Sequence, residues 1–295
     1  MTPDVKFIRR VTWLTAMAIL IQALFMAGGA WSQTPLKAIR TVVLDPGHGG
    51  GNDGAIGRTG TLEKDQTLVV AFALRKQLMA DHPGLNVIVT RSMDVDLPLA
   101  ERVHLAHNAK ADLFVSIHMN SATNLEAQGF EVFFLDPDKA MPLGTKDMTG
   151  WGTQFMTGAP TTGEADGPLH TAGAEALPTM LADLQLARAH TDSAMLATVL
   201  LQELKRACPG HRSRGVRQAN FGVLRGARVP AVVVEYGFLS NKAEERWLTR
   251  ASTRQRFAIA MSQTVARMDQ FLYRRDVIGL SDPPGSGNSN IAGTR

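Results

Sequence analysis

Four side chains that can bind a metal or move a proton stand where strand-like runs end or where the next helix begins. They are His48, Glu63, His118 and Glu235. In open α/β folds the carboxyl ends of parallel strands lie along one edge of the sheet, and ligands bind there. We therefore expect these four side chains to surround a single crevice, although they are far apart in the sequence.

Three of these residues, His48, Glu63 and His118, offer two imidazoles and one carboxylate. This is a usual ligand set for catalytic zinc and leaves one position for water. Zinc lowers the pKa of such a water to about 7 and polarises a carbonyl group under attack. A carboxylate that does not bind the metal must then carry the proton of the water to the leaving nitrogen, and Glu235 is the candidate. The residues alone thus predict metal-assisted hydrolysis of an amide or an ester.

Each of these residues also has a structural interpretation. His48 lies among glycines, which let the chain turn sharply and a ligand approach closely, and it could be a turn histidine bonded to backbone. His118 could be a buried histidine that is satisfied by hydrogen bonds, and Glu63 could favour the start of its helix. A structural Glu235 would need a cation in the protein interior, and Arg91 is a candidate for that cation.

Two further residues are candidates for contacting the substrate or for orienting the ligands. Arg91 follows the strand-like run 86–90, and Asn120 comes two residues after His118. Five other histidines are expected to lie outside the site, in exposed helical, solvated or loop surroundings: His82, His104, His107, His190 and His211. Cys208 is the one cysteine and is expected to be a spare thiol, because no partner signature accompanies it.

Strands and helices alternate along the chain that must position these residues. Apolar strand-like runs occupy 41–45, 86–90, 112–117, 130–135 and 231–235. Helical spacing of apolar residues occupies 62–79, 99–108, 180–207, 242–250 and 253–273. Ser240 or Asn241 is expected to cap the helix that begins at 242. This alternation predicts one α/β domain over 41–275, with a mostly parallel central sheet and helices on both faces.

The first 32 residues have the order of parts that is typical of a secretory signal peptide. Lys6, Arg9 and Arg10 precede the uncharged apolar run 11–26, and small residues follow it. The run is shorter than the ~20 apolar residues that a membrane-spanning helix needs. We therefore expect export to the periplasm or the cell envelope, rather than a membrane anchor.

The charge balance argues against a nucleic-acid partner. The chain has 31 basic and 27 acidic residues, and residues 1–32 hold three of the basic and one of the acidic side chains. Without that segment, 28 basic and 26 acidic residues leave a net charge of +2. We find no basic run interleaved with aromatic residues that would make a platform for single strands. We expect no nucleic-acid binding.

Two segments depart from the regular alternation. The segment 136–178 is rich in Gly, Pro, Thr and Met and has little periodicity. A stretch this long without a core of its own is usually a lid, a regulatory insertion or a mobile loop. The tail 281–295 contains Pro-Pro-Gly-Ser-Gly and is expected to be disordered.

Several separated stretches, in this order, resemble the zinc-dependent N-acetylmuramoyl-L-alanine amidases, the bacterial cell-wall amidases used in daughter-cell separation. The stretches are 44–50, 63–64, 90–91, 111–118 and 234–241. The resemblance extends over nearly all of 41–273. It implies an α/β fold with one zinc, the ligands His48, Glu63 and His118, and Glu235 as the catalytic acid/base. The implied reaction is hydrolysis of the amide that joins N-acetylmuramic acid to L-alanine in peptidoglycan.

The resemblance also suggests a form of regulation. The segment 136–178 is similar in placement to one that, in some cell-separation amidases, forms a helix that blocks the active site until an activator protein displaces it. Autoinhibition is therefore a hypothesis for this chain, with an activator protein as a partner. Glu164 and Glu175 are the acids of this segment that could reach the zinc.

Two other functions use the same residues. A zinc peptidase or deacetylase of the cell wall would cleave a different bond, so its products would differ from those of an amidase. A non-catalytic wall-binding regulator would keep the fold without turnover. Loss of a zinc ligand or of Glu235 would mark such a regulator, and all four residues are present.

Overall fold

A computed structural model of the protein describes residues 36, 38–136 and 176–278. The predicted signal peptide (1–32), the tail (281–295) and residues 137–175 of the predicted insertion lie outside this part of the chain. Glu164 and Glu175 therefore lie outside it as well. Within the described residues, no helix is both long enough and apolar enough to cross a membrane.

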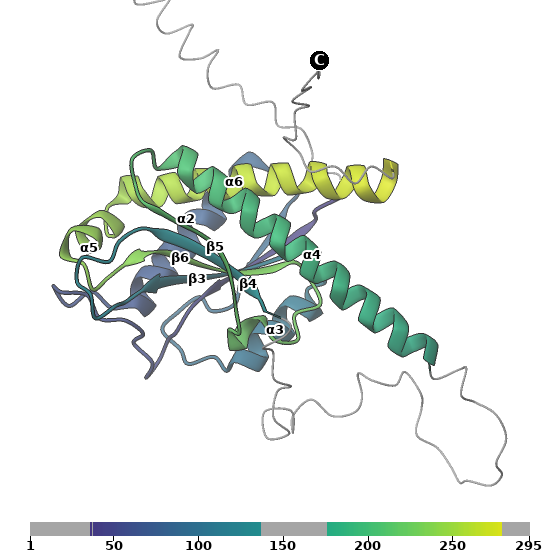
Figure 1. Cartoon of the computed structure of the whole chain (residues 1–295), viewed down its shortest axis with the longest axis horizontal. Helices are drawn as coiled ribbons and strands as arrows, with labels where there is room; N and C mark the ends of the chain where they lie inside the picture. Colours follow the sequence, from purple (N-terminus) through teal and green to yellow (C-terminus); the bar gives the residue numbers. More distant parts are fainter. Residues whose placement is uncertain (1–35, 37, 137–175, 279–295) are drawn as a thin grey trace, which may run out of the picture.

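Six strands form one sheet in the order β2-β1-β3-β6-β4-β5 (Figure 1). Their bounds are β1 Thr41–Pro46, β2 Asn86–Val89, β3 Leu113–Asn120, β4 Phe130–Leu135, β5 Ser213–Ala219 and β6 Ala231–Phe238. Each neighbouring pair is parallel except β4 with β6, which is antiparallel. The mostly parallel α/β sheet that the sequence predicts is therefore confirmed.

Helices cover both faces of the sheet. Their bounds are α2 Glu63–Asp81, α3 Leu99–Asn108, α4 Ala176–Ala207, α5 Lys242–Leu248 and α6 Ala251–Tyr273, with short turns η3 Gly222–Leu224 and η4 Arg274–Ile278. Figure 1 shows α6 on one side of the strands and α3 on the other. Apolar side chains of α2, α4 and α6 share one cluster with the sheet, and those of α3 and η3 share a second cluster.

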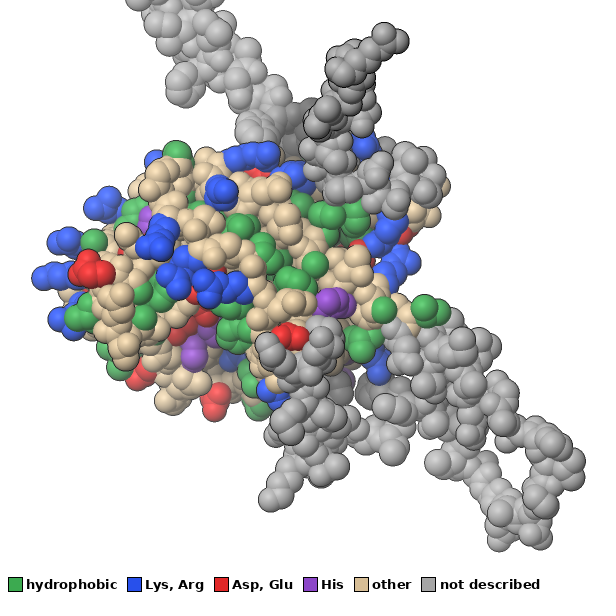
Figure 2. All heavy atoms as spheres, in the orientation of Figure 1, with side chains coloured by type: hydrophobic (Ala, Val, Ile, Leu, Met, Phe, Trp, Pro, Cys, Tyr) green, Lys and Arg blue, Asp and Glu red, His purple; other side chains and the backbone are tan. Residues whose placement is uncertain are grey.

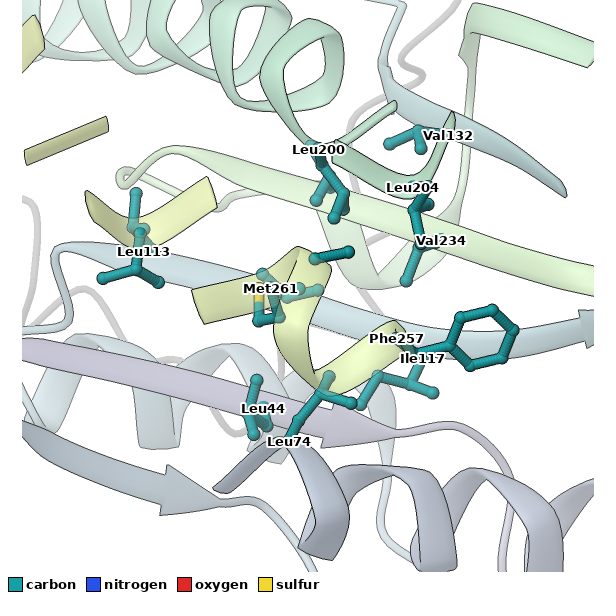
Figure 3. Close-up of a cluster of buried hydrophobic side chains, with 14 of the residues drawn as sticks. Leu44, Leu74, Leu113, Ile117, Val132, Leu200, Leu204, Val234, Phe257 and Met261 are labelled. Carbon is teal, nitrogen blue, oxygen red and sulfur yellow. The ribbon is translucent and has the colours of Figure 1, made fainter. Parts of the chain in front are cut away.

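Successive strand residues point to opposite faces, which explains why the central strands are apolar throughout. In β1, Leu44 faces α2 and α6, whereas Val43 faces α3. Figure 3 shows Leu44 and Ile117 of the sheet among Leu200 of α4 and Met261 of α6. A strand that is buried on both sides has no polar face, so its sequence is a continuous apolar run.

Three details differ from the sequence prediction or complete it. Strand β5 was not predicted, because its sequence SRGVRQA lacks an apolar run, and it pairs only with β4 at the sheet edge. Helix α4 begins at Ala176, so the predicted irregular segment extends three residues too far. Asn241 caps α5 by accepting hydrogen bonds from Ala243 N and Glu244 N. The hydroxyl of Ser240 instead accepts one from Ala122 N.

We expect Met261→Ala to lower the free energy of unfolding by about 2–5 kcal/mol, because the side chain is fully buried between α6 and the sheet. Ile259→Ala is the matched control on the same helix, since Ile259 is 39% exposed and should cost about 1 kcal/mol or less. Guanidinium titration of both variants provides the measurement. Equal losses at the two positions would contradict this description of the core.

Candidate metal centre and active site

Strand register places two candidate side chains and a further carboxylate, Glu131, in one row. His118 of β3 is paired with Glu235 of β6, and Glu235 is paired with Glu131 of β4. Paired residues of neighbouring strands point to the same face of the sheet. The row lies on the face that α3 covers, because Phe114 and Val233, four and two residues before His118 and Glu235, pack in the α3 cluster.

A tight turn after β1 brings His48 to this row. His48 has a φ of 62°, in the left-handed region that non-glycine residues rarely adopt. Gly47, just before it, lies against the His118 ring, where an added Cβ would be 2.2 Å from Cε1. Only glycine leaves room for this approach, which accounts for one of the glycines around His48.

His48, Glu63 and His118 lie together. His48 Nε2 is 3.1 Å from Glu63 Oε2, and His118 Nδ1 is 2.9 Å from Glu63 Oε1. One ligand atom from each residue lies within 4.8 Å of those of the other two. Zinc bonds of 2.0–2.1 Å in a tetrahedral site place ligand atoms about 3.3 Å apart. The three residues therefore fit a divalent metal ion in both chemistry and spacing.

Glu63 is the most constrained of the three. It is 4% exposed and begins α2, yet its carboxylate accepts hydrogen bonds from Met119 N at 3.0 Å and Ala55 N at 2.7 Å, both outside that helix. Burial alone would raise the pKa of Glu63, but hydrogen bonds from His118 and His48 outweigh it and hold the pKa well below its usual range. These bonds favour a site residue over a simple first-turn acid.

The same bonds act on His118. Burial acts to lower the pKa of its imidazole, whereas the hydrogen bond to Glu63 and the negative charge of Glu235 raise it, and the net direction is upward. His48 is oriented from its other side by Asn52, whose Oδ1 lies 2.9 Å from His48 Nδ1. Both rings are therefore held by groups that fix their orientation.

Glu235 is a buried carboxyl group beside these residues. It is 8% exposed, and its Oε2 has no hydrogen-bond partner among the described residues. Burial raises the pKa of Glu235 to about 7, with Glu63 and Glu131 adding to the rise and His118 opposing it. A carboxyl with a pKa near neutrality can both accept and donate a proton, which is the property that general acid/base catalysis requires.

Arg91 does not partner Glu235, as the structural interpretation of Glu235 would require. Its guanidinium lies under the turn after β1 and donates to Pro46 O, Gly47 O and Lys64 O. Arg91 therefore supports the backbone around His48.

Asn120 is also engaged within the protein. Its Nδ2 donates to Glu131 Oε1 at 2.8 Å, and its Oδ1 accepts from Ser121 N. Asn120 thus holds the carboxylate of Glu131, which is next to Glu235 in the row. A contact between Asn120 and the substrate stays a prediction.

Asp45 and Arg102 form a buried ion pair at 2.8 Å that sequence reasoning missed. Asp45 also accepts from Ser116 Oγ and Thr90 Oγ1, and Arg102 donates to the carbonyl oxygens of Pro46 and His48. The pair ties the turn that carries His48 to α3. Asp45 was visible as a charge inside an apolar run, but its partner lies in a distant helix.

A pocket of about 320 Å³ opens beside the two histidines. His48 and His118 line one side of it, and Leu97, Leu99 and Phe221 give it an apolar wall. The pocket therefore leaves room for part of a bound molecule beside the side chains that could hold the metal.

Two of the other histidines lie in loops, as predicted, but their rings are covered by the protein. His82 is buried, with Nε2 3.1 Å from Ser262 O. His211 stacks on Trp247 with ring centroids 3.8 Å apart and pairs with Glu244. Cys208 is buried, and burial raises the pKa of its thiol to about 11, which suits an unreactive thiol.

An α/β sheet whose edge brings two imidazoles and a carboxylate together beside a second, buried carboxyl has the parts of a metal-dependent hydrolase. Residues 42–267 match the family model described as N-acetylmuramoyl-L-alanine amidase. The chain belongs to this family.

Two relatives carry the same description. N-acetylmuramoyl-L-alanine amidase AmiA of Escherichia coli (strain K12) is 38% identical over 228 residues, which cover 77% of this chain and 75% of AmiA. N-acetylmuramoyl-L-alanine amidase AmiC of Neisseria meningitidis serogroup B is 37% identical over 226 residues, which cover 77% of this chain and 52% of AmiC. The matched part of the chain thus spans about half the length of the Neisseria relative.

Solved structures share the fold. The catalytic domain of CwlV, an N-acetylmuramoyl-L-alanine amidase from Bacillus (Paenibacillus) polymyxa var. colistinus, aligns with a TM-score of 0.56 and 28% identity. The alignment covers 77% of this chain and 97% of that domain. N-acetylmuramoyl-L-alanine amidase AmiC2 of Nostoc punctiforme aligns with a TM-score of 0.57 and 25% identity, over 78% of this chain and 97% of that one.

We expect Glu63→Ala to weaken binding of a divalent metal by at least about tenfold. Loss of a group that only hydrogen-bonds to a metal ligand already lowers metal affinity by about tenfold or more, and loss of the ligand itself should cost at least as much. Metal content after dialysis against equal zinc, measured by mass spectrometry, reports the effect. Glu101→Ala is the control, since Glu101 is an exposed acid in the first turn of α3. Full occupancy in a folded Glu63→Ala protein would contradict the role of Glu63 as a ligand.

Proposed function

We propose that this protein hydrolyses the amide bond between N-acetylmuramic acid and L-alanine in peptidoglycan, with one zinc ion held by His48, Glu63 and His118. Membership of the amidase family supports the substrate. The observation that carries the reaction type is the place of Glu235, a buried carboxyl with an unpartnered oxygen in strand register with His118.

The ligand atoms support zinc among the divalent metals. Two imidazole nitrogens and one carboxylate oxygen are a common catalytic zinc set, whereas magnesium and calcium prefer oxygen ligands. When bound, zinc would polarise the scissile carbonyl and lower the pKa of a water molecule to about 7. The charged carboxylate of Glu63, held by the two histidines and two backbone N–H groups, would keep this ligand set in place.

Glu235 would transfer the protons of the reaction. Its carboxylate takes a proton from the attacking water and later gives a proton to the nitrogen of L-alanine as the amide bond breaks. A pKa near 7 suits both steps, because the group can then change its protonation state at little cost in free energy. The ion pair of Asp45 and Arg102 would position His48 through the backbone oxygens of the turn.

We further propose export to the periplasm or cell envelope and a role in cell-wall remodelling and daughter-cell separation. The order of parts within residues 1–32 supports export. An activator protein that relieves inhibition by residues 136–178, through Glu164 or Glu175, is part of the same proposal. The amidase CwlD from Clostridioides difficile, a structural neighbour, was solved in complex with the GerS lipoprotein, so an amidase of this fold can bind a protein partner.

The Glu235→Gln variant is expected to keep its fold and its metal but to lose at least about 10² in turnover, the contribution of general acid/base catalysis. Purified peptidoglycan is the substrate, and the readout is new L-alanine amino termini together with muramic acid free of peptide. Glu126→Gln makes the same chemical change at an exposed position and should turn over normally.

Near-normal turnover by Glu235→Gln would overturn the role given to this residue. Release of acetate or of D-alanine by the wild-type protein would instead identify a deacetylase or a peptidase. No turnover by the zinc-loaded wild-type protein, either as the full chain or without residues 140–176, would favour a wall-binding regulator.

A further inference from the structure

Two arginines of the edge strand β5 share one buried carboxylate, Glu131, which lies in the row with His118 and Glu235. Arg214 Nε and Arg217 Nε each lie 3.2 Å from Glu131 Oε2. The Arg214 guanidinium also lies over the ring of Phe238, 4.9 Å from its centroid. The side chain of Glu131 is 3% exposed, whereas those of Arg214 and Arg217 are 25% and 50% exposed. Figure 2 shows Lys and Arg side chains gathered over the part of the sheet where Figure 1 labels β5.

This cluster carries more positive charge than its carboxylate requires. One cation is enough to stabilise a buried carboxylate, and Glu131 has two. The other oxygen of Glu131 is already held by Asn120. Within the described residues, each guanidinium group approaches Glu131 through Nε, and that of Arg214 donates a hydrogen bond to it, so the terminal N–H groups of both remain available. A guanidinium offers five donors in a fork that matches a carboxylate.

We propose that Arg214 and Arg217, positioned by Glu131, bind a carboxylate of the peptide stem of the substrate. This inference rests on the proposed function and adds the part of the substrate that the site recognises. The side chains of Arg214 and Arg217 would contact the stem directly. Glu131 acts through them and is a positioning residue.

The spacing of the strands indicates which part of the stem is bound. Glu131 is paired with Glu235, and β5 is the next strand beyond β4. Strands lie about 4.8 Å apart, so β5 is roughly 10 Å from the strand that carries Glu235. An extended peptide advances about 3.4 Å per residue. When L-alanine lies at Glu235, an acidic group on the second or third stem residue reaches the two arginines.

The opposite side of the row suits the sugar. The pocket beside His48 and His118 is bordered by the turn after β1, by α3 and by η3, whereas the order of strands puts β5 itself at the far side of the row from β1. The peptide stem would therefore extend over β4 and β5 while the muramoyl group faces the pocket. This orientation places the scissile amide between the metal ligands and Glu235.

The test compares two synthetic N-acetylmuramoyl pentapeptides that differ only at the acidic groups of the second and third residues, which are carboxylates in one and carboxamides in the other. The zinc-loaded full chain is expected to cleave the acidic substrate with a kcat/KM about tenfold higher or more, the range of charge-assisted hydrogen bonds. In Arg217→Gln this preference should fall to about twofold or less, with the loss in KM rather than kcat. Arg217→Lys should keep part of it.

Arg256→Gln on α6, an exposed arginine on the other face of the sheet, is the charge-matched control and should keep the full preference. Binding of the two free stem peptides to the Glu235→Gln protein, measured by calorimetry, gives a second readout that does not depend on turnover. Equal affinity for acidic and amidated peptides, or an unchanged preference in folded Arg217→Gln, would overturn the inference. Selective binding of the acidic peptide, together with no cleavage by the wild-type protein either with or without residues 140–176, would overturn the proposed function alone.

Discussion

The buried negative charge of Glu63 is the constraint on which the rest of the site depends. An ionised carboxylate in a protein interior is costly unless it is paired and hydrogen-bonded. Here His48, His118 and the backbone N–H groups of Ala55 and Met119 surround it. The turn after β1, the start of α2 and the end of β3 therefore meet at one point, and the geometry that satisfies this charge is also the geometry that a metal ion needs.

The sheet places the two other carboxyl groups of the site, Glu235 and Glu131. Parallel pairing of β3 with β6 brings Glu235 beside His118, and antiparallel pairing of β4 brings Glu131 beside Glu235. Two adjacent carboxylates would repel each other if both were charged. The surroundings of Glu131 and Glu235 differ in a way that avoids this. Glu131 forms ion pairs with two arginines, whereas Glu235 has no Lys or Arg partner among the described residues, and burial raises its pKa. One carboxyl is thus held in ion pairs, and the other is placed to exchange protons.

The fold and the grouping of His48, Glu63 and His118 were predictable because their signals are local. Buried parallel strands are apolar runs, and the side chains at their carboxyl ends form the site. Strand β5 and the ion pair of Asp45 with Arg102 were missed because an edge strand has no apolar pattern and long-range pairing leaves no mark in either segment. His211 lies in a loop, as predicted, but the polar sequence of that loop gave no sign that Trp247 covers its ring.

A crystal structure of the zinc-loaded protein, with anomalous diffraction measured on both sides of the zinc absorption edge, tests the central claim most directly. One zinc ion is expected at His48, Glu63 and His118, with two imidazole nitrogens and a carboxylate oxygen at about 2.0–2.2 Å. The Glu235 carboxyl should lie near the ion without binding it. Anomalous density at another site, or a zinc ion that lacks either imidazole, would contradict this account of the protein.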